Sequence, residues 1–220
     1  MAININQINA VIFDMDGLLV DSEPCWQKAE QKVFKEVGIH LTHEMCLQTT
    51  GKPIADVIAY WFEKAPWPNP DFSKMKAQLL DLTAGFIKTD AGLMPGVEKM
   101  IQIAQQNNWK IGLASASPMF IIESVLKQFE LEKVFDFFHS AELEKFNKPD
   151  PAVYLTVARN LGIPIENCLI MEDSGNGIKG ALASGALVVA VPSAHDFDLD
   201  IFQKAHLKVG SLNELGSLLG

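Results

Sequence analysis

Ala10-Val11-Ile12-Phe13-Asp14-Met15-Asp16-Gly17 joins a short apolar run to two acids and a glycine. Four consecutive β-formers without an alternating polar residue are typical of a strand buried on both faces. The acids and the glycine that follow predict the loop where this strand ends. This stretch therefore predicts a parallel sheet with reactive side chains at the carboxyl end of its first strand.

Three later runs have the same character. Lys110–Ala114 ends at Ser115, Cys168–Met171 ends at Glu172, and Leu187–Val191 ends at a proline. Apolar residues at helical spacing lie between these runs, for example Val153, Val157, Ala158 and Leu161 before Gly162. Strands that alternate with helices predict an α/β fold with a doubly wound parallel sheet.

The alternation is interrupted between residues 18 and 92. This stretch has helical periods, a proline-rich turn at 65–70 and no buried strand pattern. We therefore predict a core of residues 1–17 and 93–220, with a small all-helical domain of residues 18–92 inserted after the first strand. Such an insert lies at the carboxyl end of the sheet, where ligands bind in these folds.

Charge and composition exclude some classes of partner. The chain has 220 residues with a formal net charge of −9, and its Lys and Arg residues form no cluster. This charge disfavours both nucleic acid and anionic membrane surfaces, so we expect neither as a partner. A small phosphorylated metabolite is the expected partner, and we expect the chain to be a monomer.

Cysteine usage and the N-terminal sequence bear on the compartment. Cys25, Cys46 and Cys168 are far apart and odd in number, so we expect buried free thiols in a reducing compartment. The sequence before Gly17 has no basic segment followed by a long apolar one, unlike a signal peptide. We expect a cytoplasmic protein.

Acidic side chains follow two of the predicted strands. Asp14 and Asp16 end the first, and Glu172 and Asp173 end the third. The carboxyl ends of parallel strands meet at one edge of the sheet, so these four carboxylates would repel one another without a cation. Mg²⁺ prefers oxygen ligands of this kind, and it is the predicted cofactor.

Two further residues suit a phosphate group. Ser115 ends the second strand, and backbone N–H groups at a helix start after it would bind an anion. Lys148, before Pro149, adds a positive charge. Asp14 could then attack a phosphate, and Asp16 could protonate the leaving oxygen and later deprotonate water.

The residues described so far resemble the four motifs of the haloacid dehalogenase-like hydrolases. In chain order the motifs are Asp14-Met15-Asp16-Gly17, Leu113-Ala114-Ser115-Ala116-Ser117, Lys148-Pro149 and Glu172-Asp173-Ser174. The resemblance covers nearly the whole chain and is strongest to the β-phosphoglucomutase-like branch. Residues 13–24 resemble the phosphatases of 2-deoxyglucose 6-phosphate and of hexitol phosphates within that branch.

The resemblance implies roles for the first-motif aspartates. It implies that Asp14 is the nucleophile and a metal ligand. It implies that Asp16 is the general acid and base, and that its backbone carbonyl also binds the metal. The product of the first step would be an aspartyl-phosphate on Asp14, which water then hydrolyses.

The resemblance also implies roles for the other motifs. Ser115 and the backbone around Ala116 would bind phosphate, and Lys148 would pair with phosphate and nucleophile. Asp173 would bind Mg²⁺, whereas Glu172 would be either a ligand or an orienting residue. The helical insert corresponds to the small cap of this family, which closes over the substrate.

Three functions are open at this point. Mg²⁺-dependent hydrolysis of small sugar or polyol phosphates is favoured because Asp16 is absent from family members that dehalogenate or cleave phosphonates. A sugar-phosphate mutase is the first alternative, but the mutases of this branch carry histidine where this chain has Trp26. A non-catalytic sugar-phosphate binder is the second, and it would have no use for a general acid.

A glycine pattern raises one competing interpretation. Residues 175–180 match GxGxxG and would follow a strand, as in dinucleotide-binding folds. The adjacent Glu172 and Asp173 would repel a pyrophosphate, and too little chain follows for the second half of such a fold. We therefore expect these glycines to serve a tight loop and close helix packing.

Overall fold

A computed structural model describes residues 5–219 and divides the chain into two compact units. The first unit, the core, runs to Asp21 and resumes at Leu93. The second unit, named the cap, is Ser22–Gly92. Residues 1–4 belong to the N-terminal stretch that we expect not to be a signal peptide, and they lie outside the described residues.

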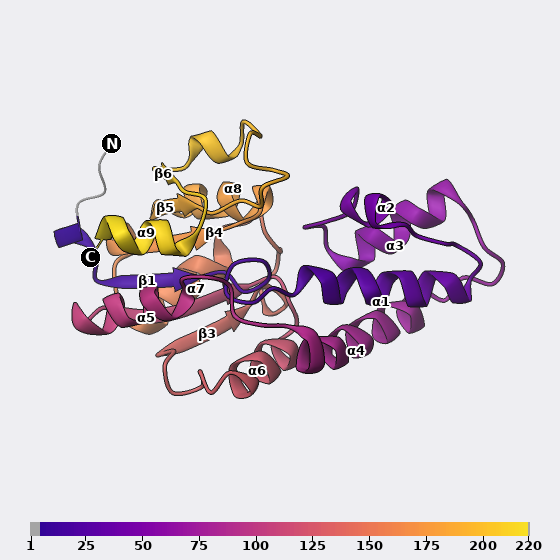
Figure 1. Cartoon of the computed structure of the whole chain (residues 1–220), viewed down its shortest axis with the longest axis horizontal. Coiled ribbons are helices and arrows are strands. Elements are labelled where there is room, and N and C mark those ends of the chain that lie inside the picture. Colours follow the sequence, from indigo (N-terminus) through magenta and orange to yellow (C-terminus); the bar gives the residue numbers. More distant parts are fainter. Residues whose placement is uncertain (1–4, 220) are drawn as a thin grey trace. The chain divides into compact units, whose positions relative to one another are not determined.

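Within residues 5–219 the core is built on one six-stranded parallel sheet with the order β3-β2-β1-β4-β5-β6 (Figure 1). The strands are β1 (Ala10–Phe13), β2 (Lys110–Ser115), β3 (Phe137–Ser140), β4 (Cys168–Glu172), β5 (Leu187–Ala190) and β6 (Leu207–Lys208). The strand order reverses at β1, so the crevice at its carboxyl end lies between β2 and β4. The predicted α/β doubly wound fold is confirmed.

The outer strands β3 and β6 carry little sequence signal. The first three residues of β3 are only half-buried and include His139, and β6 has two residues. An apolar run marks a strand only when both faces are buried. The four central strands meet that condition and were predicted, whereas these two were not.

Helices cover both faces of the sheet. One face packs on α7 (Ala152–Leu161) and α8 (Gly175–Ser184). Three others are α5 (Val97–Gln106), α6 (Met119–Gln128) and α9 (Leu212–Leu219), and α5 lies beside α9 (Figure 1). Short 3-10 helices occupy Ile5–Gln7, Ala141–Leu143, Ile165–Asn167 and Phe202–Lys204.

The segment after Asp14 folds back on the core. Leu19 and Val20 donate backbone hydrogen bonds to Met15, and Val20 pairs with Leu93 in an isolated bridge. Met94 donates to the carbonyl of Leu19. These bonds join residues 18–21 to the core, so the boundary lies after Asp21 and not after residue 17 as the sequence suggested. The two segments in which the chain leaves the core and re-enters it therefore lie side by side.

The cap contains α1 (Glu23–Glu36), α2 (His43–Leu47), α3 (Ile54–Lys64) and α4 (Phe72–Asp90). Its own apolar cluster includes Phe34, Trp61, Trp67, Met75 and Leu79. Trp67 packs edge-on against Phe34 and Phe62. Thr42 and Asp71 accept backbone N–H bonds at the starts of α2 and α4. The cap thus buries its aromatic residues in a core of its own.

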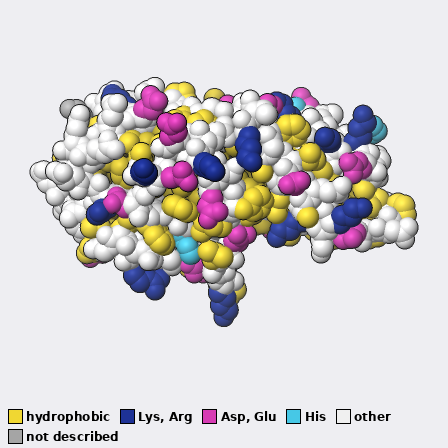
Figure 2. Space-filling view, turned by 90° about the horizontal axis from the view of Figure 1, so that it is seen from below, with side chains coloured by type: hydrophobic (Ala, Val, Ile, Leu, Met, Phe, Trp, Pro, Cys, Tyr) yellow, Lys and Arg dark blue, Asp and Glu magenta, His cyan; other side chains and the backbone are white. Residues whose placement is uncertain are grey.

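The surface carries both signs of charge. Figure 2 shows basic side chains interspersed with acidic and apolar ones on one face of the molecule.

Among residues 5–219, no helix is both long and apolar enough to cross a bilayer. Within the same described range, Cys25, Cys46 and Cys168 are buried, and none of them is in a disulfide.

The packing of β2 against α7 gives a stability prediction. A Cβ at Gly112 would lie 2.5 Å from Cγ1 of Val157 and 3.1 Å from Cδ1 of Leu161. We expect Gly112→Ala to lower the free energy of unfolding by about 1–3 kcal/mol because α7 must move away from the sheet. Urea denaturation followed by circular dichroism measures this loss.

Gly210→Ala is the matched control in the same unit. Its Cβ would lie 3.5 Å from a side-chain oxygen of Glu214, an ordinary contact. We expect a change within about 0.5 kcal/mol. Equal stability losses in the two variants would contradict the close packing of β2 and α7.

Candidate active site

The carboxyl ends of the three central strands bring the motif residues together. Asp14 follows β1, Ser115 ends β2 and Glu172 ends β4. The register pairs Phe13 with both Leu113 and Met171, so the three ends lie level. The convergence predicted from the sequence follows from this parallel register.

Lys148 lies at the centre of the site. Its Nζ donates to Oδ1 of Asp14 at 2.6 Å, to Oε1 of Glu172 at 2.6 Å and to the carbonyl of Ala114 at 2.9 Å. A lysine ammonium has three N–H donors, so all of them are used. The side chain is only 5% exposed. Lys148 therefore connects the ends of β1, β2 and β4.

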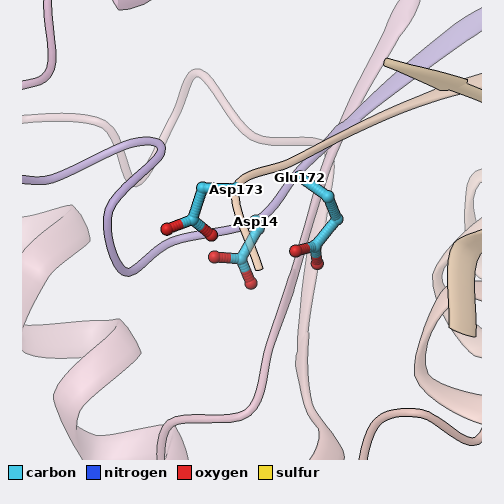
Figure 3. Close-up of side chains that lie close together, drawn as sticks. All are labelled: Asp14, Glu172 and Asp173. Atoms are coloured by element: carbon cyan, nitrogen blue, oxygen red, sulfur yellow. The ribbon is translucent and has the colours of Figure 1, made fainter. Parts of the chain in front are cut away.

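Three carboxylates form a candidate metal centre. Asp14, Glu172 and Asp173 each offer an oxygen within 4.8 Å of the others. Figure 3 shows the carboxylate of Asp14 between the other two. A Cβ at Gly17 would lie 2.1 Å from Oδ2 of Asp173, so the first-motif loop packs directly on this carboxylate. Clustered oxygens of this kind fit Mg²⁺.

Burial and negative charge dominate the electrostatics. Burial and the neighbouring Glu172 raise the pKa of Asp14 to about 8, although Lys148 acts in the opposite direction. Burial would lower the pKa of Lys148, but Asp14 and Glu172 outweigh it, so this pKa lies well above its usual range. The site therefore has a stable buried ammonium and an excess of negative charge that a cation would relieve.

Asp16 faces the loop after β2. Its Oδ2 accepts a hydrogen bond from the hydroxyl of Ser117 at 2.7 Å and a longer one from Ser115 at 3.4 Å. Ser115 in turn accepts the N–H of Ser117 at 3.0 Å. The Ser117 hydroxyl thus bonds to the candidate acid and does not cap the following helix. Asp16 does not belong to the carboxylate trio.

The loop after Ser115 differs from the sequence expectation. The helix α6 begins at Met119, so the N–H groups around the exposed Ala116 belong to a turn and not to a helix start. Pro118 lies at the N-cap position of α6. Ser115 still ends β2 and contacts the candidate acid, and Ala116 directly follows it in the chain.

Sequence reasoning missed two partners of Glu172. The Tyr154 hydroxyl on α7 donates to Oε1 of Glu172 at 2.6 Å, and Ser174 donates to Oε2 at 3.2 Å. A tyrosine within an apolar helical period looks like any core aromatic. Ser174 lies in the fourth motif, but its neighbours gave no sign of its contact.

The glycines after Asp173 serve packing, as predicted. A Cβ at Gly177 would lie 1.8 Å from Oε2 of Glu172, and one at Gly180 would lie 3.1 Å from the carbonyl of Pro149. The first turn of α8 therefore lies directly against a buried carboxylate. A pyrophosphate could not occupy that place, which agrees with the rejection of a dinucleotide site.

Comparison with known proteins identifies the family. The sequence model of the haloacid dehalogenase-like hydrolases matches residues 11–191, which include all four motifs. The chain belongs to this family.

Relatives whose names state an activity indicate the class of enzyme. Hexitol phosphatase B of Escherichia coli strain K12 is 36% identical over 210 residues, which is 95% of each chain. Phosphorylated carbohydrates phosphatase of Thermotoga maritima is 28% identical over 81% of this chain and 82% of that protein. With the family match, these relatives make the chain a phosphatase.

Solved structures agree with the fold. CbbY from Rhodobacter sphaeroides in complex with phosphate superimposes with a TM-score of 0.85 at 23% identity, covering 96% of this chain and 99% of that chain. β-Phosphoglucomutase from Clostridium difficile superimposes with a TM-score of 0.79 at 28% identity, covering 94% and 93%.

The buried charge of Asp14 gives a pH-dependent stability prediction. Because the folded pKa of about 8 exceeds the ordinary 3.8, metal-free wild-type protein loses stability as the pH rises from about 4 to 8. Asp14→Asn removes this titration. We expect its melting temperature in a chelator to exceed that of wild type by a margin that widens to pH 8 and then levels.

Thermal unfolding of both proteins between pH 5 and 9 tests this linkage. Added Mg²⁺ should raise the melting temperature of wild type more than that of Asp14→Asn, because ligands that bind the folded state stabilise it. A pH-independent difference between the two proteins would contradict the raised pKa.

Proposed function

We propose that this chain hydrolyses phosphate monoesters of sugars or polyols, with Mg²⁺, through an aspartyl-phosphate on Asp14. The single observation that carries the proposal is the buried Lys148, which holds Asp14 beside Glu172 and Asp173. A lysine–carboxylate pair alone would be structural. The two further carboxylates and Asp16 add the features that phosphoryl transfer requires.

In the first step, Asp14 attacks phosphorus and the bond from phosphorus to the ester oxygen breaks. Asp16 gives its proton to that departing oxygen, which leaves as an alcohol. Ser117 holds the Asp16 carboxylate from the β2 side, 2.7 Å away. Lys148 compensates part of the negative charge that Asp14 and the phosphate bring together.

In the second step, Asp16 takes a proton from water, and the water oxygen attacks phosphorus. The bond from phosphorus to Asp14 breaks, and Asp14 is regenerated with release of inorganic phosphate. Ser115 and the backbone of Ala116 hold the phosphate oxygens in both steps. One residue thus serves as acid and then as base, and no net proton is gained by the enzyme.

Asp14, Asp173 and the backbone carbonyl of Asp16 are the proposed magnesium ligands. Their fit rests on the carboxylate trio, whose clustered oxygens are ligands of the kind that Mg²⁺ prefers. When bound, Mg²⁺ supplies charge compensation for the nucleophile and the phosphate oxygens.

The names of the relatives support the proposed substrate class. Hexitol phosphatase B and phosphorylated carbohydrates phosphatase support a hexitol or hexose phosphate as the substrate. The cap is the proposed source of specificity, because it is a large insertion that begins in the chain shortly after the first motif. We further propose that the protein acts as a monomer in the cytoplasm.

A mutase is the second candidate. The similarity to β-phosphoglucomutase from Clostridium difficile favours it. Trp26 disfavours it, because an indole offers no base or orienting acceptor. The two candidates differ in product, since a mutase returns a phosphorylated sugar whereas a phosphatase releases inorganic phosphate.

A substrate panel tests the proposal. We expect inorganic phosphate to be released from hexitol and hexose monophosphates in Mg²⁺, with nucleotide monophosphates slower, and no release in a chelator. Asp14→Asn should lower kcat by at least about 10⁴-fold, because the nucleophile is removed. Lys148→Met should lower kcat about 10²–10³-fold.

The outcomes separate the candidates. Isomerised phosphosugar without phosphate release would overturn hydrolysis in favour of the mutase. Saturable binding without any turnover would favour the binder. Retained turnover in a folded Asp14→Asn protein would refute the covalent mechanism.

The hydrogen bond from Ser117 gives a separate prediction. Ser117→Ala removes the 2.7 Å contact to Asp16, so the acid is less well placed for both proton transfers. We expect kcat to fall about tenfold, a part of the ~10²–10⁴-fold contribution of a general acid, with KM within about twofold. Steady-state kinetics with a hexitol phosphate measures this change.

Ser217→Ala is the control, because it removes an exposed hydroxyl from the C-terminal helix α9. Its kcat should equal that of wild type. An unchanged kcat in Ser117→Ala would show that Asp16 does not depend on this hydroxyl.

A further inference from the structure

A buried tyrosine hydroxyl is connected to Lys148 through one shared hydrogen-bond acceptor, Glu172. Tyr154 is fully buried in the first turn of α7. Its hydroxyl lies 2.6 Å from Oε1 of Glu172 and 3.2 Å from the carbonyl of Gly177. A phenol has one proton to donate. The Glu172 carboxylate is charged and closer than the Gly177 carbonyl, so it is the stronger acceptor.

The same carboxylate oxygen also accepts from the lysine. Oε1 of Glu172 lies 2.6 Å from Nζ of Lys148, and that Nζ lies 2.6 Å from Oδ1 of Asp14. Tyr154, Glu172, Lys148 and Asp14 therefore form one continuous chain of buried hydrogen bonds. The lysine Nζ also lies 5.0 Å from the centre of the Tyr154 ring.

The surroundings leave Glu172 few other positions. Its side chain is completely buried, so its charge depends on protein donors. Ser174 bonds to Oε2 at 3.2 Å, and the missing side chain of Gly177 provides the space that the carboxylate fills. Two donors on Oε1 and one on Oε2 fix the orientation of the carboxylate.

We propose that Tyr154 is a positioning residue for the reaction, acting through Glu172 to hold Lys148 against Asp14. The proposal rests on the roles of Asp14 and Lys148 in the proposed function. The Tyr154 hydroxyl compensates part of the negative charge on Glu172. Lys148 therefore stays hydrogen-bonded to both Glu172 and Asp14 and does not shift toward Glu172.

The conservative variant removes only this hydroxyl. In Tyr154→Phe the ring still fills its place among Val153, Val157 and Ile178 in the apolar cluster. Oε1 of Glu172 would then have Lys148 as its remaining donor. We expect the ammonium to move toward Glu172 and away from Asp14, so the nucleophile is less well neutralised when phosphate arrives.

A double-mutant cycle of Tyr154→Phe and Glu172→Gln tests the proposal. Wild type, both single variants and the double variant are assayed for kcat and KM with Mg²⁺ and a hexitol phosphate. We expect Tyr154→Phe to lower kcat about tenfold with KM within about twofold. The double variant should equal Glu172→Gln within about twofold, because the tyrosine acts only through the glutamate.

The contrary results are well defined. Multiplied losses in the double variant would show that Tyr154 acts independently of Glu172 and would overturn the proposal. An unchanged kcat in Tyr154→Phe would overturn it as well. Ser184→Ala, which removes another buried hydroxyl of the core, should keep the wild-type kcat and thereby separate positioning from packing.

A binding measurement separates this proposal from the proposed function. Beryllium fluoride with Mg²⁺ mimics a phosphorylated aspartate, and calorimetry gives its affinity for all four proteins without turnover. We expect about tenfold weaker binding to Tyr154→Phe and the same non-additivity in the cycle. If wild type released no phosphate, the proposed function would fail, and these affinities would still decide the role of Tyr154.

Discussion

The three hydrogen bonds of the Lys148 ammonium are the interaction on which the site depends. A buried ammonium is costly unless every donor is satisfied and its charge is compensated. Its acceptors come from the ends of β1, β2 and β4, which are neighbours only because the sheet is parallel and its order reverses at β1. The fold therefore supplies the lysine with partners, and the lysine ties the three strand ends together.

One lysine does not balance the site. Asp14, Glu172 and Asp173 bring more negative charge than Lys148 can compensate, and burial together with the neighbouring Glu172 raises the pKa of Asp14. A fold that holds like charges together loses stability, and a bound cation would restore part of it.

The chain folds into two units with separate apolar cores. The core holds every motif residue, whereas the cap has its own aromatic cluster and its own capped helices. Phosphatases and mutases share this core, as the similarity to hexitol phosphatase B and to β-phosphoglucomutase illustrates. Trp26 in the cap, where we expect the mutases of this branch to carry histidine, is our reason for proposing hydrolysis and not transfer.

The sequence by itself determined the four central strands, the helical insert and the motif residues, because apolar runs and strand-end acids are local patterns. Other features came only from the tertiary structure. The Ser117 hydroxyl bonds to Asp16, which lies 101 positions earlier in the chain, and Tyr154 reaches Glu172 from a helix whose apolar period marks it as core. A hydrogen bond between distant segments leaves no periodic trace, since its geometry exists only after the sheet has placed both partners.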